Sequence, residues 1–222
     1  MEFILFMFFG LLEVYALFAL MFKTFRLPYF EYFKEISIIA VVVALTSYFI
    51  RVYFEINQLA DIITHLVLYI LFFRYMIKVK IWRGIIISLV YFGYGVLNLI
   101  IYLVLSNFGL VTEKLVNNPS SLDAFILQFA TATSALLISY ALHKFNLGFS
   151  FIIRPPHDFF IKSKIKRSDF VILTSIIIVA CILMFTFYLI FHHKSFISIP
   201  MIILSYVVLL YLAYRKDMSR DN

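Results

Sequence analysis

The sequence predicts an all-α integral membrane protein with seven transmembrane helices, its amino terminus outside and its carboxyl terminus inside. Three observations lead to this class. Of the 222 residues, 64% are hydrophobic and only 14% are charged, a balance that one soluble core of this size cannot hide. The apolar runs are about 20 residues long, which is the length of a helix that crosses the hydrocarbon layer. Basic residues gather in alternate connections, as they do where loops lie in the cytoplasm.

Each of seven apolar stretches is expected to form one helix, and together they make a single transmembrane domain over residues 1–222. They span residues 3–22, 36–54, 59–77, 85–105, 122–142, 170–191 and 196–214. The first has no basic segment before it and no small-residue cleavage site after it, so it is expected to be retained rather than removed as a signal peptide. The second and third are separated by the short turn "EINQLAD", and the third and fourth by a basic turn.

The fifth stretch carries the clearest local signals. Ser120 or Ser121 can cap its first turn, and Asp123 lies near the positive end of the helix dipole. Its middle reads "FATATSAL", a run of small residues that lets helix backbones approach closely. This helix is therefore expected near the centre of the bundle. The sixth and seventh stretches are predicted from hydropathy, and basic segments flank them.

The distribution of charge sets the orientation. Sixteen of the nineteen Lys and Arg residues lie in the first, third and fifth connections and in the tail, whereas the other connections hold only Arg51, Lys114 and Lys194. Because basic loops stay in the cytoplasm, the amino terminus is expected outside and the carboxyl terminus inside. Residues 144–169 are then a basic cytoplasmic loop, and residues 215–222 are a short cytoplasmic tail.

The most basic stretch of the chain, "RPPHDFFIKSKIKR", lies in that loop. Topology alone predicts basic residues there, since each gains ~1 kcal/mol beside an anionic leaflet. The net charge of +7 is explained in the same way, so no nucleic-acid partner is expected. The paired prolines hold the chain extended, which leaves open a docking surface for a cytoplasmic signalling protein or another membrane subunit. The basic residues of this candidate surface are Arg154, Lys162, Lys164, Lys166 and Arg167.

Polar residues inside the apolar stretches are costly to bury and mark a candidate ligand site. Glu13 lies about ten residues into the first helix, near the bilayer centre. Around the first outer turn, Arg51 precedes Glu55 by four residues and Asp61 precedes His65 by four, so each pair is expected to share a helix face. These four side chains would then lie side by side at the outer surface.

Two amides extend this group. Asn98 lies in the fourth helix and Gln128 in the fifth, and with Tyr94 or Tyr102 on the wall they would complete an outer cavity bounded by the second to fifth helices. A plainer interpretation remains open, in which the charged pairs only neutralise each other and the amides are interhelical links worth ~0.6 kcal/mol each. The candidate ligand-binding residues are Glu13, Arg51, Asp61, His65, Asn98 and Gln128.

The sequence contains none of the common catalytic or cofactor patterns. HExxH, GxSxG, a P-loop and a dinucleotide-binding glycine pattern are all absent. The adjacent His192 and His193 point apart on a helix and do not form a metal site, and the single cysteine, Cys181, excludes a disulfide framework. We therefore expect neither an enzyme nor a bound cofactor or metal.

The layout suggests a family. The segment "GLLEVYALFALMFKTFRLPYFEYFKEISIIAVVVALTSYFIR", followed by an outer turn and a basic inner loop, resembles the membrane sensor region of Gram-positive receptor histidine kinases of the accessory-gene-regulator type. The resemblance implies a bacterial cell membrane location and an outward-facing bundle that binds a secreted peptide in quorum sensing. In that family the last helix continues into a kinase, but only "RKDMSRDN" follows Tyr214 here, so the sensor is expected to act through a partner.

Two function classes compete on these observations. The first is a non-enzymatic receptor or regulatory subunit that senses an extracellular small molecule or peptide and signals through a cytoplasmic partner, alone or as a homodimer. The second is a small secondary transporter, or a transporter subunit, that uses Glu13, Asp61 and His65 as an ion relay. The depth of the polar groups in the membrane distinguishes the two function classes, because an ion relay needs polar groups that continue to the inner side.

Overall fold

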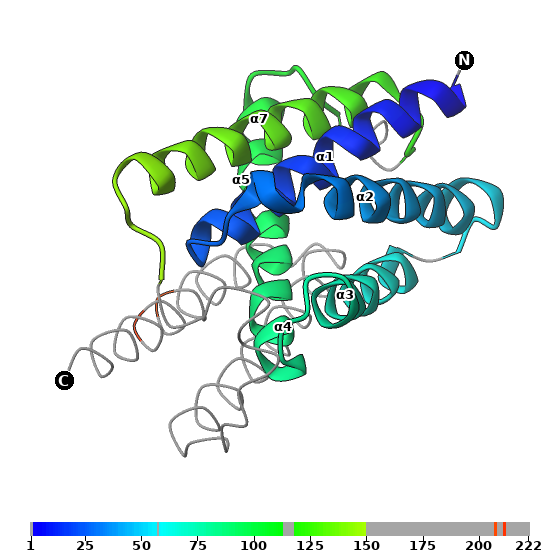
Figure 1. The fold of residues 1–222 in the computed structure, drawn as a ribbon. Helices are drawn as coiled ribbons and strands as arrows, with labels where there is room; N and C mark the ends of the chain where they lie inside the picture. Colours follow the sequence, from blue (N-terminus) through cyan, green and yellow to red (C-terminus); the bar gives the residue numbers. More distant parts are fainter. Residues whose placement is uncertain (1, 57, 113–117, 150–206, 208–210, 212–222) are drawn as a thin grey trace. The chain divides into compact units, whose positions relative to one another are not determined.

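The structure is a computed structural model that describes residues 2–56, 58–112, 118–149, 207 and 211. Residues 1–148 form one compact unit, and the description concerns this unit (Figure 1). The predicted sixth helix, the predicted seventh helix except for Val207 and Tyr211, and the basic surface from Arg154 to Arg167 lie outside the described residues, as does Lys114. Within the described part of the chain all regular structure is helical, which confirms the all-α class.

The helices follow the predicted apolar stretches closely. They are α1 (Glu2–Thr24), η1 (Tyr29–Tyr32), α2 (Phe33–Tyr48), η2 (Phe49–Tyr53), α3 (Gln58–Tyr75), α4 (Ile81–Ser88), α5 (Val90–Asn107) and α7 (Leu122–Lys144). Among the described residues, four segments are long and apolar enough to cross a membrane: α1, Tyr29–Tyr53, Ile81–Asn107 and α7. Helix α3, the predicted third span, is not one of these four. The fourth predicted helix is interrupted at Leu89, which separates α4 from α5.

Several helices end on a residue in the left-handed backbone region. After α1, for example, Arg26 has φ 53° and the N–H of Leu27 donates to the Phe22 carbonyl at 2.8 Å. This arrangement satisfies carbonyls that the helix itself leaves unpaired. The residues with positive φ are Arg26, Glu55, Lys78, Gly109 and Asn146.

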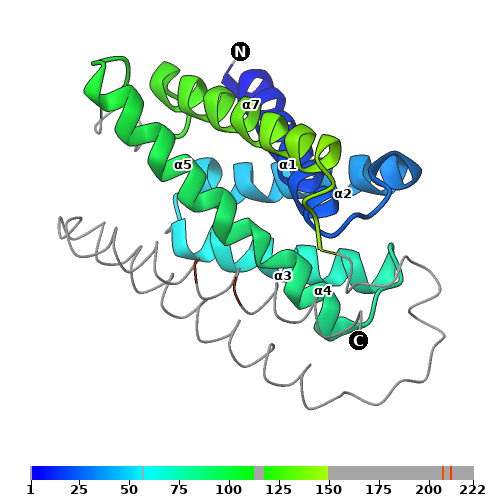
Figure 2. The ribbon, with the colours of Figure 1, turned by 90° about the vertical axis from the view of Figure 1, so that its left-hand side faces the viewer.

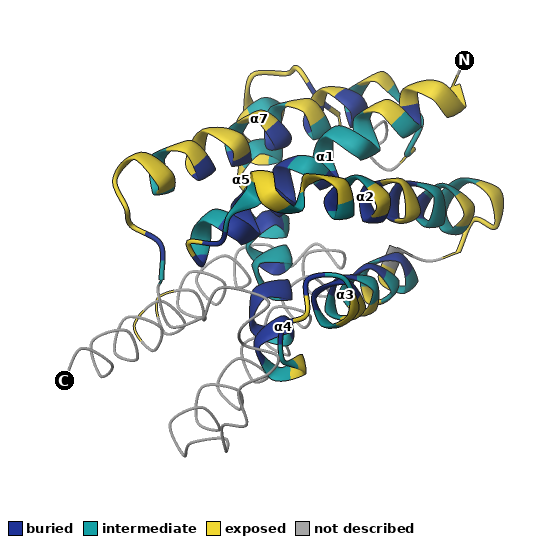
Figure 3. Cartoon of the chain, in the orientation of Figure 1, coloured by how far each residue is buried: buried dark blue, intermediate teal, exposed yellow. Residues whose placement is uncertain are grey.

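Helix α1 lies at the centre of this unit, and α7 packs along it. The two run side by side in the same direction, and α2 returns along α1 in the opposite direction (Figures 1 and 2). Thr131, Ala132 and Ala135 of α7 are completely buried, which confirms that the small-residue run lies at a helix interface and allows close approach. The apolar side chains on the opposite faces of these helices are exposed (Figure 3).

Aromatic rings fill the space between the second half of α1 and the second half of α3. The Phe18 ring packs edge-on against Tyr69 at 5.4 Å and against Phe72 at 4.9 Å between centroids. Phe22 and Phe73 extend the same packing at 5.9 Å. All five side chains are almost inaccessible to solvent. We call Phe18, Phe22, Tyr69, Phe72 and Phe73 the aromatic core.

A hydrogen bond and a close backbone contact join the carboxyl-terminal ends of α1 and α7 next to this core. The Arg26 guanidinium donates a hydrogen bond to the Asn146 carbonyl. Gly148 lies so close to α1 that a Cβ at this position would overlap the Lys23 carbonyl oxygen and touch the Arg26 side chain. Glycine is therefore required here by space rather than by backbone conformation.

Candidate functional site

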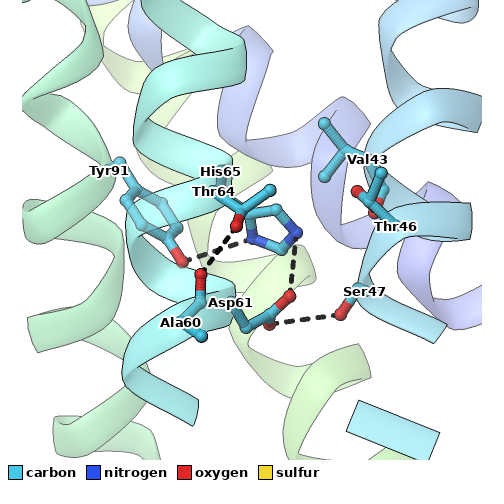
Figure 4. Close-up of polar contacts among 8 residues, drawn as sticks. All are labelled: Val43, Thr46, Ser47, Ala60, Asp61, Thr64, His65 and Tyr91. Carbon is cyan, nitrogen blue, oxygen red and sulfur yellow. Dashed lines mark hydrogen bonds and ion pairs between the residues drawn. The ribbon is translucent and has the colours of Figure 1, made fainter. Parts of the chain in front are cut away.

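A string of four polar side chains connects α2, α3 and α5. Ser47 donates a hydrogen bond to Asp61 Oδ2 at 3.2 Å, and Asp61 Oδ1 lies 3.3 Å from His65 Nε2 (Figure 4). The other ring nitrogen, His65 Nδ1, lies 3.5 Å from the Tyr91 hydroxyl. Ser47, Asp61 and His65 are each more than nine-tenths buried. The string therefore links three helices through three buried side chains and the half-buried Tyr91.

Local structure explains how α3 presents its two members of this string. Asp61 and His65 are one turn apart, so both side chains lie on the same face of the helix. Asp61 also stands in the first turn of α3, where the helix dipole favours a negative charge. The His65 ring thus lies between the two groups, with Nε2 nearer to Asp61 and Nδ1 nearer to the Tyr91 hydroxyl.

Arg51 approaches the same region from an irregular turn. The residues after α2 form the π-helical turn η2, which contains Arg51, and such turns are frequent at functional sites. The guanidinium lies within electrostatic range of Glu13 and His65. The sequence placed Glu55 on the same helix face as Arg51, but the helix ends at Tyr53, and Glu55 is exposed with φ 50°. The π turn thus separates the two residues.

Glu13 reaches this group from the middle of α1. Its carboxyl faces the Tyr94 hydroxyl of α5 and lies within electrostatic range of Arg51 and Asp61. Tyr94 is 4% exposed, and its hydroxyl forms no hydrogen bond of good geometry within the described residues. We call Glu13, Arg51, Asp61 and His65 the ionic cluster.

One face of α5 carries the contacts from this cluster onward to α7. Tyr91, Tyr94 and Asn98 are spaced three and four residues apart, which places them on one side of the helix. Asn98 donates a hydrogen bond to the Thr131 hydroxyl of α7 at 3.3 Å. Gln128 lies three residues before Thr131, and its buried Oε1 has no hydrogen-bond partner in the described part of the structure. Asn98 therefore lies at the α5–α7 interface, and Gln128 lies one turn before its partner Thr131 on α7; we call Asn98 and Gln128 the amide pair.

The aromatic core borders the ionic cluster on one side. Along α3, Tyr69 lies one turn beyond His65, and its ring centroid is 6.1 Å from that of His65 and 5.4 Å from that of Tyr91. Along α1, Phe18 follows Glu13 by five residues and packs against Tyr69. Toward the carboxyl-terminal ends of α1 and α3, the cluster thus gives way to closely packed rings.

The chemistry of this site is that of charge and hydrogen bonding. Among the described residues, no group of three His, Cys, Asp or Glu side chains is placed to hold a metal ion. The structure brings together Glu13, Arg51, Asp61 and His65, with the amide pair further along α5. Sequence patterns missed two members of the network, Ser47 and Thr131. Ser47 precedes Arg51 by one turn in "TSYFIR", a polar spacing that could have pointed to it.

Comparisons of this chain with protein families, with curated proteins and with solved structures find no match.

Proposed function

We propose that this chain is a multi-pass membrane sensor in which the ionic cluster responds to an extracellular ligand and passes the response to a cytoplasmic partner. The cluster joins α1, η2, α3 and α5 through charged and hydrogen-bonded groups. Ionisable groups at membrane depth are expensive and generally functional. A ligand that changes one charge here would change the packing preference of several helices together, which is what a sensor requires.

The aromatic core is the observation that favours a sensor over a transporter. With the amino terminus outside, α1 and α3 both run inward, so the aromatic core lies on the cytoplasmic side of the ionic cluster. An ion relay needs polar groups that continue across the membrane. Phe18, Phe72 and Tyr69 instead pack ring against ring directly beyond the cluster. On the other side, the α5 face with Asn98 leads from the cluster toward the outside.

The orientation is part of this proposal and has its own test. In a Cys181→Ala background, Asn118→Cys lies in the outer connection and Lys34→Cys in the first inner one, both at exposed positions. An impermeant thiol reagent on intact cells should label the former and label the latter only after permeabilisation. The reverse pattern would overturn both the orientation and the sensor proposal, because the cluster would then face inward.

The sensor proposal is tested by a conformational reporter. A fluorophore on Tyr75→Cys, an exposed position at the carboxyl-terminal end of α3, should change its emission when protein in lipid nanodiscs receives medium conditioned by the source cells. Glu13→Gln should fold normally and lose this response, because it removes the charge without changing the shape. Glu55→Gln is the matched control, since this carboxylate is exposed and outside the cluster. An unchanged response in Glu13→Gln would contradict the proposal.

One observation favours the transporter alternative: Glu13, Asp61 and His65 do lie in one cluster, as a relay would need at its first step. Proteoliposomes with an internal pH dye decide between the classes. A transporter should show proton flux that Asp61→Asn abolishes. A sensor should show no flux above that of empty liposomes, with the fluorescence response intact.

The basic surface from Arg154 to Arg167 is the proposed contact for the cytoplasmic partner. Support for it comes from the sequence, in which the longest predicted inner connection combines basic residues with an extended proline pair. In the sequence, this loop follows α7, whose carboxyl-terminal end contacts that of α1 through Arg26, Asn146 and Gly148.

A further inference from the structure

We propose that the ligand presents an organic ammonium group, which binds between the Glu13 carboxylate and the Tyr94 hydroxyl of the ionic cluster. This inference rests on the proposed sensor function and names the chemical class that the same site would take. It is carried by the charge of the cluster, by one buried hydroxyl without a partner and by the aromatic surroundings.

The charge of the cluster favours a cation. The charged and titratable groups that face one another are Glu13 from α1, Arg51 from η2, Asp61, His65 and Tyr69 from α3, and Tyr91 and Tyr94 from α5. With His65 neutral, two carboxylates stand against one guanidinium. Asp61 accepts a hydrogen bond from Ser47 through Oδ2 and has the His65 ring 3.3 Å from Oδ1. Glu13 faces the Tyr94 hydroxyl, and it is the carboxylate that we assign to a ligand cation.

The Tyr94 hydroxyl is the second, independent observation. This side chain is more than nine-tenths buried, its hydroxyl faces Glu13, and it lacks a hydrogen bond of good geometry. A buried hydroxyl without a well-formed hydrogen bond is costly, so a ligand that supplies such a bond would be favoured here. An ammonium group has three N–H donors and can bond the Glu13 carboxylate and the Tyr94 oxygen together.

The remaining surroundings suit the same ligand. Tyr69 and Tyr91 present rings next to the cluster, packed edge to face at 5.4 Å, and aromatic rings attract ammonium groups through their π-electrons. Further along the same face of α5, the amide pair offers hydrogen bonds to a polar group of the ligand, and Gln128 Oε1 is free to accept one. Within the ionic cluster, an anionic ligand would find Arg51, which already lies within electrostatic range of Glu13.

The probe for the test is phenethylamine, compared with its neutral analogue 2-phenylethanol and its anionic analogue 3-phenylpropanoate. Binding is measured on the full chain in nanodiscs by the shift of its thermal unfolding, with empty nanodiscs correcting for partition into lipid. We expect phenethylamine alone to raise the unfolding temperature. Glu13→Gln should weaken its affinity at least tenfold.

Tyr94→Phe is the sharper variant, because it removes only the hydroxyl that faces Glu13, which forms no hydrogen bond of good geometry within the described residues. It should keep or raise the stability of the ligand-free protein and weaken phenethylamine binding three- to tenfold. Tyr140→Phe is the matched control at an exposed position of α7 and should change neither property.

Three results would overturn the ammonium site. They are equal stabilisation by the neutral analogue, unchanged amine affinity in Tyr94→Phe, and a large loss of stability in Tyr94→Phe without ligand. If the Tyr75→Cys reporter still responds to conditioned medium while phenethylamine does not bind, the ammonium site is wrong and the sensor proposal stands. If the reporter is silent and proton flux is present, the sensor proposal itself fails.

Discussion

The aromatic core and the ionic cluster are neighbours along α1 and α3, yet they are built in opposite ways. In the core, Phe18, Phe72 and Phe73 fill space with rings that need no specific partner. In the cluster, Asp61 and His65 occupy a similarly buried environment, but each polar atom requires a particular neighbour. The packing energy of the aromatic core does not depend on whether a ligand is bound. The energy of the ionic cluster changes whenever one of its charges or hydrogen-bond partners changes.

This difference assigns separate tasks to the two halves of the described unit. Dense apolar packing stabilises the fold, because the loss of one ring would leave a cavity that neighbouring side chains cannot fill. Buried polar groups give sensitivity, because an incomplete set of partners is costly. Substitutions in the core should therefore change stability, and substitutions in the cluster should change response at a smaller cost in stability.

The largest effect on stability is expected for Phe18→Ala. Phe18 is completely buried and touches Tyr69, Phe72, Phe73 and Phe22. Removal of its ring should lower the free energy of unfolding by about 3 kcal/mol, mainly through the cavity that remains. Thermal unfolding in nanodiscs measures this loss. Phe8→Ala, at an exposed position of α1, is the control and should change stability little.

Gly148→Val should come next and tests the contact between the carboxyl-terminal ends of α1 and α7. A side chain here would overlap the Lys23 carbonyl oxygen, which is backbone and cannot rotate away. We expect a loss of about 2 kcal/mol from the strain of overpacking. Gly109→Ala provides a contrast, because Gly109 has open space around it and only its φ of 69° opposes a side chain. Equal effects of the two substitutions would show that close packing is not what holds Gly148.

The sequence predicted much of the helix layout because hydropathy and length determine it. The predicted stretches 3–22 and 122–142 lie within α1 and α7, and the capping role of Ser121 is confirmed by its bond to the Ala124 N–H. The convergence of Glu13 with Asp61 could not be predicted, since it depends on how far α1 is rotated about its axis. The π turn at Arg51 was equally hidden, because "FIRVY" reads as ordinary helix.

Asp61→Asn tests the cluster with a smaller change. The amide keeps the shape of the carboxylate and can still accept from Ser47, but it loses the charge that attracts His65. Stability should fall by about 1 kcal/mol, while the Tyr75→Cys fluorescence response should disappear. Asp123→Asn is the matched control at the start of α7, where the carboxylate binds the Thr112 N–H away from the cluster. A full response in Asp61→Asn would place the ligand elsewhere.

The smallest structural effect is expected for Asn98→Leu, and this substitution separates a ligand contact from a helix link. Asn98 is bonded to Thr131, and such interhelical bonds are worth about 0.6 kcal/mol in membrane proteins. Thr131 would keep its own bond to the Leu127 carbonyl, and leucine fills a similar volume, so the unfolding temperature should hardly move.

If the amide pair contacts the ligand, Asn98→Leu should nevertheless reduce the fluorescence response severalfold. Thr131→Val removes the same interhelical bond from the α7 side and leaves the Asn98 amide in place. A response lost in Asn98→Leu but kept in Thr131→Val means that the amide itself meets the ligand. Equal losses in both would mean that the bond only positions α5 against α7, and that the ligand contacts end at Tyr94.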